Sequence, residues 1–413
     1  MPSEWRDLSL GEFVRLQRGH DLTASEQQAG NVPVMGSAGP NGTHSEALAK
    51  GPGVVIGRSG SSIGRVHYSP VDFWPHNTCL YVTDFLGNHP RFAYYLLQTL
   101  DLASYNSGSA QPSLNRNYVY GLRLQVPEPD EQAQIAAVLQ SVDDRIDLLR
   151  QTNATLESIA QALFKSWFID FDPVRAKAEG REPEGMDAAT AALFPAEFEE
   201  SALGWIPKGW RVGTLTDAFE VNPNRKLSKG TDAKYLEMAN APTSGHRPLE
   251  RVGLRAFGSG CKFLNGDALL AKITPCLENG KSAFVDFLED TEVGWGSTEF
   301  IVLRSKPLLP TYAAYLMARH EPFRQYAIQA MTGTSGRQRV ELSRLQQYPM
   351  ALPPDASIAL ALDPTLSALQ GRIAANDSQA KALADLRDTL LPRLISGKLR
   401  LPEAKVQLED ALA

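Results

Sequence analysis

The sequence predicts an α+β protein in which two similar mixed domains are joined by two long antiparallel helices that pair within the chain. The first observation behind this prediction is a heptad-patterned stretch that occurs twice, 227 residues apart. The second is that each stretch follows a segment in which short β-prone runs alternate with Gly, Pro and Asn turns. The third is the length of 413 residues, which suits two or three domains.

Apolar side chains in the two stretches recur in alternating steps of four and three residues, as in paired helices. Asn153, Asn376 and Arg387 fall in the same seam. Such polar groups are costly in an apolar interface, so they either set the register or face a polar partner. The positions expected to pack are Ile135, Leu139, Val142, Ile146, Leu149, Leu156 and Leu163 in the first helix and Leu366, Leu369, Ile373, Leu383 and Leu390 in the second.

Local signals predict where the long helices begin and end. Asp130 suits the N-cap of the first helix, which can run to about Phe168. Asp363 suits the N-cap of the second helix, because Pro364 would then stand at the first helical position. A later proline predicts that this helix ends near Leu391.

These signals divide the chain into six parts. Each domain is expected to contain one amphipathic helix, at residues 91–102 and 311–319. The parts are a first domain (1–128), the first long helix (129–172), a connecting segment with a short helix (173–207), a second domain (208–352), the second long helix (353–397) and a C-terminal tail (398–413).

The charge is unevenly distributed along the chain. The net charge of −6 by itself argues mildly against nucleic-acid binding. Residues 128–204 carry 6 basic and 16 acidic side chains, whereas residues 205–352 carry 19 basic and 14 acidic ones. An acidic helical part with a more basic domain is compatible with DNA contact by the domains alone.

Polar, glycine-containing loops in both domains are candidate DNA-contacting segments. Arg, Asn and Gln can make bidentate contacts to base edges, and Ser and Thr can bind phosphates. The alternative is that these stretches are tight turns and solvated surface loops. The loops at 107–117 and 332–341 occur at equivalent places in both halves, which favours the functional interpretation for that pair, whereas the two interpretations are balanced for the other loops. The candidates are Arg58, Ser59, Ser61, Arg65, Ser107, Ser109, Gln111, Asn115, Arg116 and Asn117 in the first domain and Lys272, Thr274, Lys281, Thr332, Thr334, Ser335, Arg337, Gln338 and Arg339 in the second.

The sequence shows no active site that we can identify. The stretch Gly280-Lys281-Ser282 lacks the earlier glycine of a P-loop, and the stretch 222–225 lacks the second proline and the aromatic residue of an amino-methyltransferase signature. His76 is expected to be structural. The three cysteines have no metal-binding spacing and are expected to be reduced. No stretch reaches the length of a membrane span, so we expect no membrane association and a cytoplasmic location.

Three stretches resemble the DNA-specificity subunit of type I restriction-modification systems. They are residues 127–135 at the start of the first long helix, residues 167–177 continuing through 207–210, and residues 390–399 at the end of the second helix. The order of the parts matches over essentially the whole chain. One departure is that residues 353–358 lack the Glu131-Gln132 pair of the first helix. We therefore expect this half to dock its modification subunit differently or less tightly.

The resemblance implies two target-recognition domains related by a pseudo-two-fold axis, each reading one half of a split, asymmetric double-stranded DNA site. It implies that the long helices are spacers that set the gap between the half-sites. Two modification (methyltransferase) subunits and a restriction (translocase-nuclease) subunit would bind this chain, in a bacterium or archaeon. S-adenosylmethionine, ATP and Mg²⁺ would act in those partners, and this chain would hold no cofactor, metal or catalytic residue.

Two alternatives remain open. The chain could serve a related system in which methylase and nuclease share one polypeptide, which neighbouring coding sequences would reveal. It could instead be a duplicated interaction scaffold without DNA contact. In that case, replacing Arg337, Gln338 and Arg339 with alanine would leave methylation specificity untouched.

Overall fold

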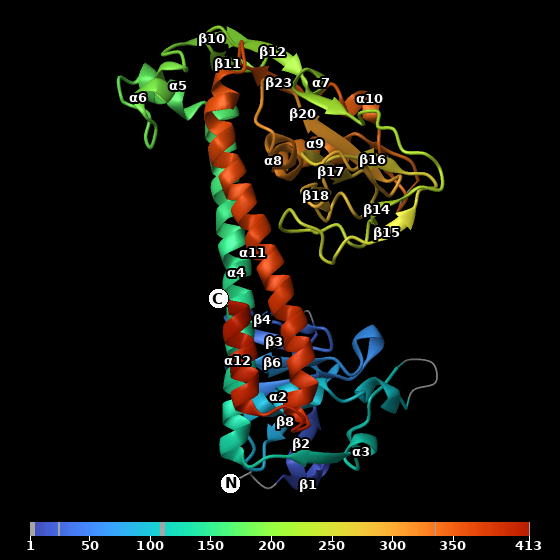
Figure 1. The fold of residues 1–413 in the computed structure, drawn as a ribbon. Helices are drawn as coiled ribbons and strands as arrows, with labels where there is room; N and C mark the ends of the chain where they lie inside the picture. The colour runs from blue at the N-terminus through green and yellow to red at the C-terminus, as the bar shows by residue number, and fades with distance from the viewer. Residues whose placement is uncertain (1–4, 24, 108–111, 335, 413) are drawn as a thin grey trace. The chain divides into compact units, whose positions relative to one another are not determined.

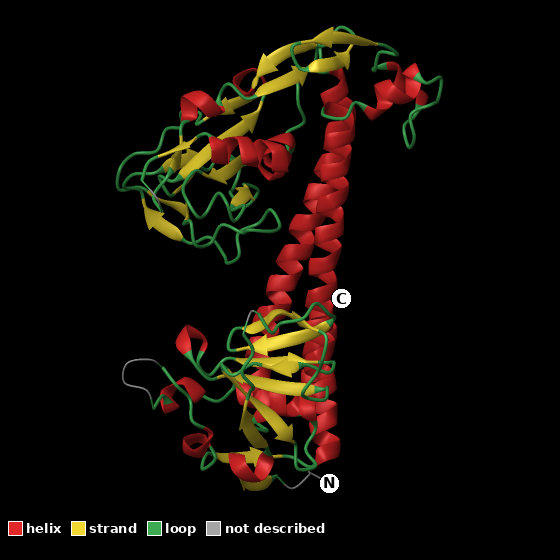
Figure 2. Ribbon diagram, turned by 180° about the vertical axis from the view of Figure 1, so that it is seen from behind, coloured by secondary structure: helices red, strands yellow, loops and turns green. Residues whose placement is uncertain are grey.

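The computed structural model describes residues 5–23, 25–107, 112–334 and 336–412. It contains two compact units. Unit 1 comprises Met1–Asp147 and Ala380–Ala413, and unit 2 comprises Leu148–Gln379. Each long helix therefore contributes a segment to both units. Figure 1 labels the elements, and Figure 2 distinguishes helices from strands.

Domain 1, residues 6–126 of unit 1, is a mixed α and β domain. Its central antiparallel sheet has the strand order β2-β8-β5-β6, a smaller sheet has the order β4-β3-β7, and the first strand pairs with the last, β1 with β9. The elements are β1 (Arg6–Ser9), α1 (Leu10–Phe13), β2 (Arg15–Arg18), β3 (Val32–Gly36), β4 (Gly39–His44), β5 (Gly53–Gly57), η1 (Gly60–Ser62), β6 (Val66–Ser69), β7 (Trp74–Pro75), β8 (Cys79–Asp84), α2 (Pro90–Gln98), η2 (Leu102–Tyr105), α3 (Arg116–Val119) and β9 (Arg123–Val126).

Domain 2, residues 211–352 of unit 2, contains a central antiparallel sheet of order β13-β20-β17-β18 and a second sheet of order β15-β14-β19-β16. Its elements are β12 (Arg211–Thr214), α7 (Leu215–Ala218), β13 (Phe219–Val221), β14 (Asp232–Leu236), β15 (Leu254–Ala256), β16 (Cys261–Phe263), β17 (Asp267–Ala271), β18 (Ser282–Phe284), β19 (Gly294–Gly296), β20 (Phe300–Ser305), α8 (Ala313–Arg319), α9 (Glu321–Gln329), β21 (Met331–Thr332), β22 (Arg339–Val340), α10 (Leu342–Leu345) and β23 (Pro349–Leu352).

The two domains share one plan. In each, the first strand pairs antiparallel with the last, β1 with β9 and β12 with β23. A one-turn helix with a capping box follows, Ser9 with Glu12 and Thr214 with Asp217. The central strands β5 and β17 are buried along their whole length, as expected for strands that are covered on both faces. The duplication inferred from the sequence is therefore visible in the domain architecture.

The long helices α4 (Pro129–Phe168) and α11 (Ser357–Ile395) pack antiparallel in each unit. In unit 1, Arg387 Nη1 donates to Asp143 Oδ1 at 2.8 Å. In unit 2, Asn376 Nδ2 donates to Asn153 Oδ1 at 2.8 Å, and Asn153 Nδ2 donates to the carbonyl of Ile373 at 3.1 Å. The seam asparagines thus satisfy each other, which pins the register of the pair.

The residues predicted to pack in the helix seam are withdrawn from solvent. Those that are buried are Ile135, Leu139, Val142, Ile146, Leu149, Leu366, Ile373, Leu383 and Leu390. Leu156, Leu163 and Leu369 are half-buried. The predicted intramolecular pairing of the helices is confirmed.

The predicted helix ends need correction. Helix α4 begins at Pro129, so Asp130 lies in its first turn rather than at the cap. Helix α11 begins at Ser357, which places Asp363 and Pro364 inside it. Burial of Ile358 and Leu362 in the core explains this early start, because packing of an apolar face outweighs the local preference of a proline.

Other segments are more structured than predicted. The C-terminal tail contains helix α12 (Leu401–Leu412), whose Ala404 packs in the core of unit 1. The connecting segment holds α5 (Asp172–Ala178), α6 (Ala188–Ala192) and the hairpin β10–β11 (Phe198–Ser201 and Gly204–Pro207). Helix α2 ends at Gln98, short of the predicted residue 102, and helix α9 was not predicted. Over the residues described, we find no helix long and apolar enough to cross a membrane.

Candidate nucleic-acid interface

In domain 1 the two candidate loops lie side by side. The first loop follows β5, and the second precedes α3. Leu114 N donates to the carbonyl of Arg58 at 2.8 Å, and Ser59 and Ser113 form an antiparallel bridge. Arg58 N donates in turn to the carbonyl of Thr78 at 2.9 Å. Backbone hydrogen bonds therefore bring together loops that are separated by about fifty residues of sequence.

An open cavity of about 700 Å³ adjoins these loops. Arg116 Nη1 donates to the carbonyl of Leu16 at 2.8 Å, and Asn115 Oδ1 accepts from Asn117 N at 3.0 Å. The lining residues are Gln17, Arg18, Gly19, His20, Asp21, Arg58, Leu80, Ser107, Ser113, Leu114, Asn115, Arg116 and Asn117.

Domain 2 repeats this arrangement. Val340 N donates to the carbonyl of Lys272 at 2.9 Å, and Lys272 N donates to the carbonyl of Glu299 at 2.9 Å. Thr274 N donates to the carbonyl of Gln338 at 3.1 Å, and Gln338 N donates to Thr274 Oγ1 at 3.1 Å. The loop after β17 and the loop before α10 are thus joined as their counterparts are in domain 1, with Lys272 in the place of Arg58.

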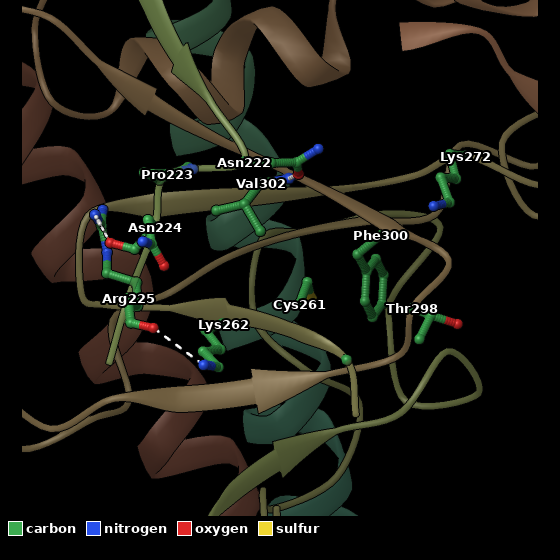
Figure 3. A pocket seen from close by; sticks show the side chains of 11 residues that line it. Asn222, Pro223, Asn224, Arg225, Cys261, Lys262, Lys272, Thr298, Phe300 and Val302 are labelled. Atoms are coloured by element: carbon green, nitrogen blue, oxygen red, sulfur yellow. Dashed lines mark hydrogen bonds between the residues drawn. The ribbon is translucent and has the colours of Figure 1, made fainter. Parts of the chain in front are cut away.

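A pocket of about 510 Å³ lies beside this junction. Figure 3 shows the side chains of Asn224, Lys262 and Lys272 around it. The Cys261 thiol also lines it; burial raises the pKa of this thiol to about 12, so it stays neutral at pH 7. The lining residues are Asn222, Pro223, Asn224, Arg225, Gly260, Cys261, Lys262, Lys272, Thr298, Phe300 and Val302.

Some predicted DNA-contacting cations are already engaged within domain 2. Arg339 forms a bidentate pair with Glu299, with N–O distances of 2.8 and 2.9 Å. Hydrogen bonds from Arg339 hold the pKa of the Glu299 carboxyl below its ordinary value, and the charge of Lys272 lowers it further. Lys281 Nζ donates to the carbonyl of Met238 at 2.7 Å. Arg339 would have to give up its pair with Glu299 to make a bidentate contact with a base, and Lys281 has already used two of its three N–H groups.

The remaining predicted residues fall into four groups. Arg58, Ser107, Asn115, Arg116, Asn117 and Lys272 line the cavities. Ser61, Arg65, Thr332, Thr334 and Arg337 are exposed but do not line them, and Ser59, Thr274 and Gln338 help to join the loops. Ser109, Gln111 and Ser335 lie outside the described residues.

Sequence reasoning missed one segment in each domain. Residues 19–21 follow β2 and residues 222–225 follow β13, the equivalent strand. Both segments line the cavity of their domain, together with Lys262 from β16 in domain 2. Position in the repeat could have identified these segments, because both follow the one-turn helix and the first strand of the central sheet.

The arrangement is suited to contacting an anionic, hydrogen-bonding ligand. Each cavity combines guanidinium or ammonium groups with carboxamides, the groups that bind phosphates and base edges. Within the described residues, no three His, Cys, Asp or Glu side chains are grouped so as to hold a metal ion.

Comparison with known proteins adds sequence relatives and a shared fold. Residues 2–158 match the family described as type I restriction modification DNA specificity domain. The chain is 24% identical over 372 residues to the specificity subunit of type I restriction enzyme HindI from Haemophilus influenzae, covering 75% of this chain and 77% of that one. It is 26% identical over 332 residues to the MjaIX specificity subunit of Methanocaldococcus jannaschii, covering 76% and 69%.

The architecture also has a solved counterpart. The crystal structure of a type I restriction-modification system S subunit from M. genitalium aligns with a TM-score of 0.55 and 15% sequence identity. The alignment covers 95% of this chain and 96% of the other. At this identity the likeness concerns the fold alone, and it confirms the predicted fold class.

Proposed function

We propose that this chain is a DNA-specificity subunit of a type I restriction-modification system and that it binds a bipartite, asymmetric DNA site with its two domains. We further propose that it carries two modification subunits and a restriction subunit. In this assembly S-adenosylmethionine, ATP and Mg²⁺ act in the partners, and this chain supplies recognition rather than catalysis.

The observation that carries the proposal is the repetition of one loop junction in both domains. In each, a basic residue after a buried central strand accepts a backbone hydrogen bond from a later polar loop, Arg58 from Leu114 and Lys272 from Val340. The two junctions differ in the side chains around them. Two similar backbone junctions that are surrounded by different side chains support recognition of two different half-sites.

One sequence expectation about the partners changes. Gln132 is fully buried and bonded within unit 1, where its Nε2 donates to Asn88 Oδ1 and to the carbonyl of Pro127, both at 2.9 Å. It therefore presents no side chain to another subunit. The expected difference in docking of the second modification subunit stays a prediction, and it now rests on Glu131 alone.

Mapping of methylated adenines by long-read sequencing, in cells that express this chain with its partner subunits, tests the proposal. We expect two short specific sequences separated by a gap of constant length, and DNA binding by the complex that weakens steeply with salt. Replacing Arg337 and Gln338 together with alanine should relax only one half-site, and Arg58→Ala only the other.

Three outcomes would count against this assignment. A single contiguous recognition block would refute the two-domain model. Unchanged methylation in both variants would favour the interaction scaffold without DNA contact. Arg339 is left out of the double variant because its replacement would also remove the ion pair with Glu299. A loss of DNA contact could then not be told apart from a loss of structure. The third outcome is a neighbouring gene that encodes a methylase fused to a nuclease. This chain would then have one partner polypeptide instead of separate modification and restriction subunits.

Shortening both long helices tests their role as spacers. Because Asn153 and Asn376 fix the register, the deletion must be matched, for example residues 145–151 together with 379–385. Seven residues of helix span about 10 Å, the length of about three base pairs. We expect the gap to shorten by about that amount while both half-sites stay the same. Altered half-sites with an unchanged gap would refute a spacer role.

A further inference from the structure

We propose that the turn after β13 is a further DNA-reading element of domain 2, in which Asn224 contacts an adenine edge and Lys262 a phosphate. The proposal rests on the DNA-binding function proposed above and deepens it. Neither residue was a candidate from the sequence, and both line the pocket beside the Lys272 junction (Figure 3).

The turn is held in a defined conformation by Asn222. Asn222 N donates to the carbonyl of Val302 at 2.7 Å, and Asn222 Oδ1 accepts from Val302 N at 2.9 Å. The residue has a φ of 52°, in the left-handed region that Asn tolerates better than most residues. The backbone and the side chain of Asn222 thus both bond to Val302 of β20, at the point where the chain leaves the sheet.

Arg225 also holds the turn in place. Its Nη2 lies 3.5 Å from Oδ1 of Asp267, which has no exposed surface and is also bonded by Arg304 Nε at 2.5 Å. The carbonyl of Arg225 accepts from Lys262 Nζ at 3.1 Å. These bonds use the Arg225 guanidinium internally and hold Lys262 at the pocket.

Asn224 is left as the projecting side chain of the turn. It is exposed, and in the described part of the chain its carboxamide has no hydrogen-bond partner. An Asn carboxamide can bond both N6 and N7 of adenine in the major groove. A side chain on a rigid turn that lines a cationic pocket has the chemistry and the support needed for base contact.

The lysines supply the complementary contact. Lys262 and Lys272 both line the pocket, and none of the described lining residues carries a carboxylate. In domain 1 the equivalent turn carries Asp21, which accepts from Arg18 Nη2 at 3.3 Å. The two turns therefore offer different hydrogen-bonding groups at the same place in the repeat, as two halves of an asymmetric site require.

The test compares variants of the whole chain in complex with its partner subunits. Asn224→Ala should relax one base position of the domain 2 half-site, with about a ten- to hundredfold loss of discrimination there. Asn224→Asp should shift the preference at that position toward cytosine, whose N4 donates to carboxylates. Gln325→Ala, which removes an exposed carboxamide on α9 that does not line the pocket, is the matched control.

A second measurement examines the phosphate contact. Lys262→Ala should weaken binding of all DNA sequences and reduce the slope of log K against log salt by about one. Lys405→Ala removes one exposed positive charge from unit 1 and should leave the slope unchanged. Thermal melting of each variant shows whether it is folded.

The outcomes separate this inference from the proposed function. If Asn224→Ala leaves every methylated position unchanged while Arg337→Ala with Gln338→Ala relaxes one half-site, the turn reads nothing and the proposed function stands. If the wild-type complex recognises no bipartite site, both fail. Equal salt slopes for Lys262→Ala and wild type would overturn the phosphate contact.

Discussion

Domains 1 and 2 have the same plan, but different side chains attach them to the long helices. In unit 1, Gln132 of α4 accepts from His89 N at 2.9 Å, at the start of α2. In unit 2, Asp363 of α11 accepts from Thr311 N at 2.7 Å, just before α8. A side-chain oxygen of a long helix fulfils the same task in both units. Gln132 and Asp363 do not occupy equivalent positions in the sequence repeat. The two units therefore make the same kind of contact with different residues.

One attachment is the same in both units, and it uses a buried tyrosine. Tyr95 of α2 donates to Asp143 at 2.6 Å, and Tyr315 of α8 donates to Glu157 at 2.6 Å. Burial raises the pKa of both phenols well above the ordinary value, so both remain donors at neutral pH. Both acceptors belong to α4.

Unit 2 has an additional ionic attachment. Asp286 of domain 2 accepts from His246 Nε2 at 3.1 Å and from Gln370 Nε2 of α11 at 2.7 Å. Arg247 donates to the carbonyl of Ala374 at 3.0 Å. Charged side chains therefore attach domain 2 to α11, whereas Gln132 in unit 1 is neutral. Acid should weaken the attachment through Asp286 more than the attachment through Gln132.

The largest expected effect is at Gln132. Gln132→Leu leaves three polar partners unsatisfied in a buried site and should lower the free energy of unfolding of unit 1 by about 2–4 kcal/mol. Urea denaturation measures this loss. Gln134→Leu, on the exposed face of the same helical turn, is the control. Equal stabilities of the two variants would show that Gln132 does not fasten domain 1.

A smaller, pH-dependent effect is expected at Asp286. Burial opposes its charge, but the hydrogen bond and charge of His246, with Arg247 and Gln370, bring the pKa of Asp286 below its ordinary value. A carboxyl with a lowered folded-state pKa contributes stability above its unfolded pKa of about 3.9 and loses it as pH falls through the folded value. Asp286→Asn should therefore cost about 1–3 kcal/mol at pH 7 and less below about pH 4.

Urea denaturation at several pH values checks this prediction. Tyr312 and Asp377 also lie near His246 and Arg247, and both are retained in wild type and variant. A cost that stays constant from pH 7 to pH 3 would show that the Asp286 charge is not what attaches domain 2.

The smallest expected effect is at Asp363. Its partner, Thr311 N, is exposed enough for water to replace the carboxylate. Asp363→Ala should cost about 0.5–1 kcal/mol, in the range of a lost helix cap. Thermal unfolding compared with Ser367→Ala, an exposed position on α11, isolates the contact. A cost as large as that of Gln132→Leu would mean that the two attachments are energetically equivalent after all.

Local patterns predicted much of the fold. The heptads of α4 and α11 identified nearly all buried seam positions, because a helix buries residues at a repeating interval. The short strands expected in both domains are present. The prediction was wrong for the start of α11, where Asp363 and Pro364 looked like a cap. The carboxylate instead caps a segment of domain 2, a contact between residues 52 positions apart.

The lining of the two candidate cavities was only partly predictable. Polar loops identified Arg58 and Lys272, because their composition is unusual. They did not identify Asn224 or Lys262, since a short turn after a strand looks ordinary until the fold places it beside another loop. Nor does the sequence show that Arg339 pairs with Glu299, which lies directly before another strand.

The sequence by itself therefore determined that the chain contains two similar domains and two long pairing helices, because apolar periodicity and turn residues are local properties. The tertiary structure decided which polar residues are used internally and which remain for a ligand. It showed that the seam asparagines bond each other and that Gln132 is buried. Whether a polar group is free depends on partners distant in sequence, and no local pattern records them.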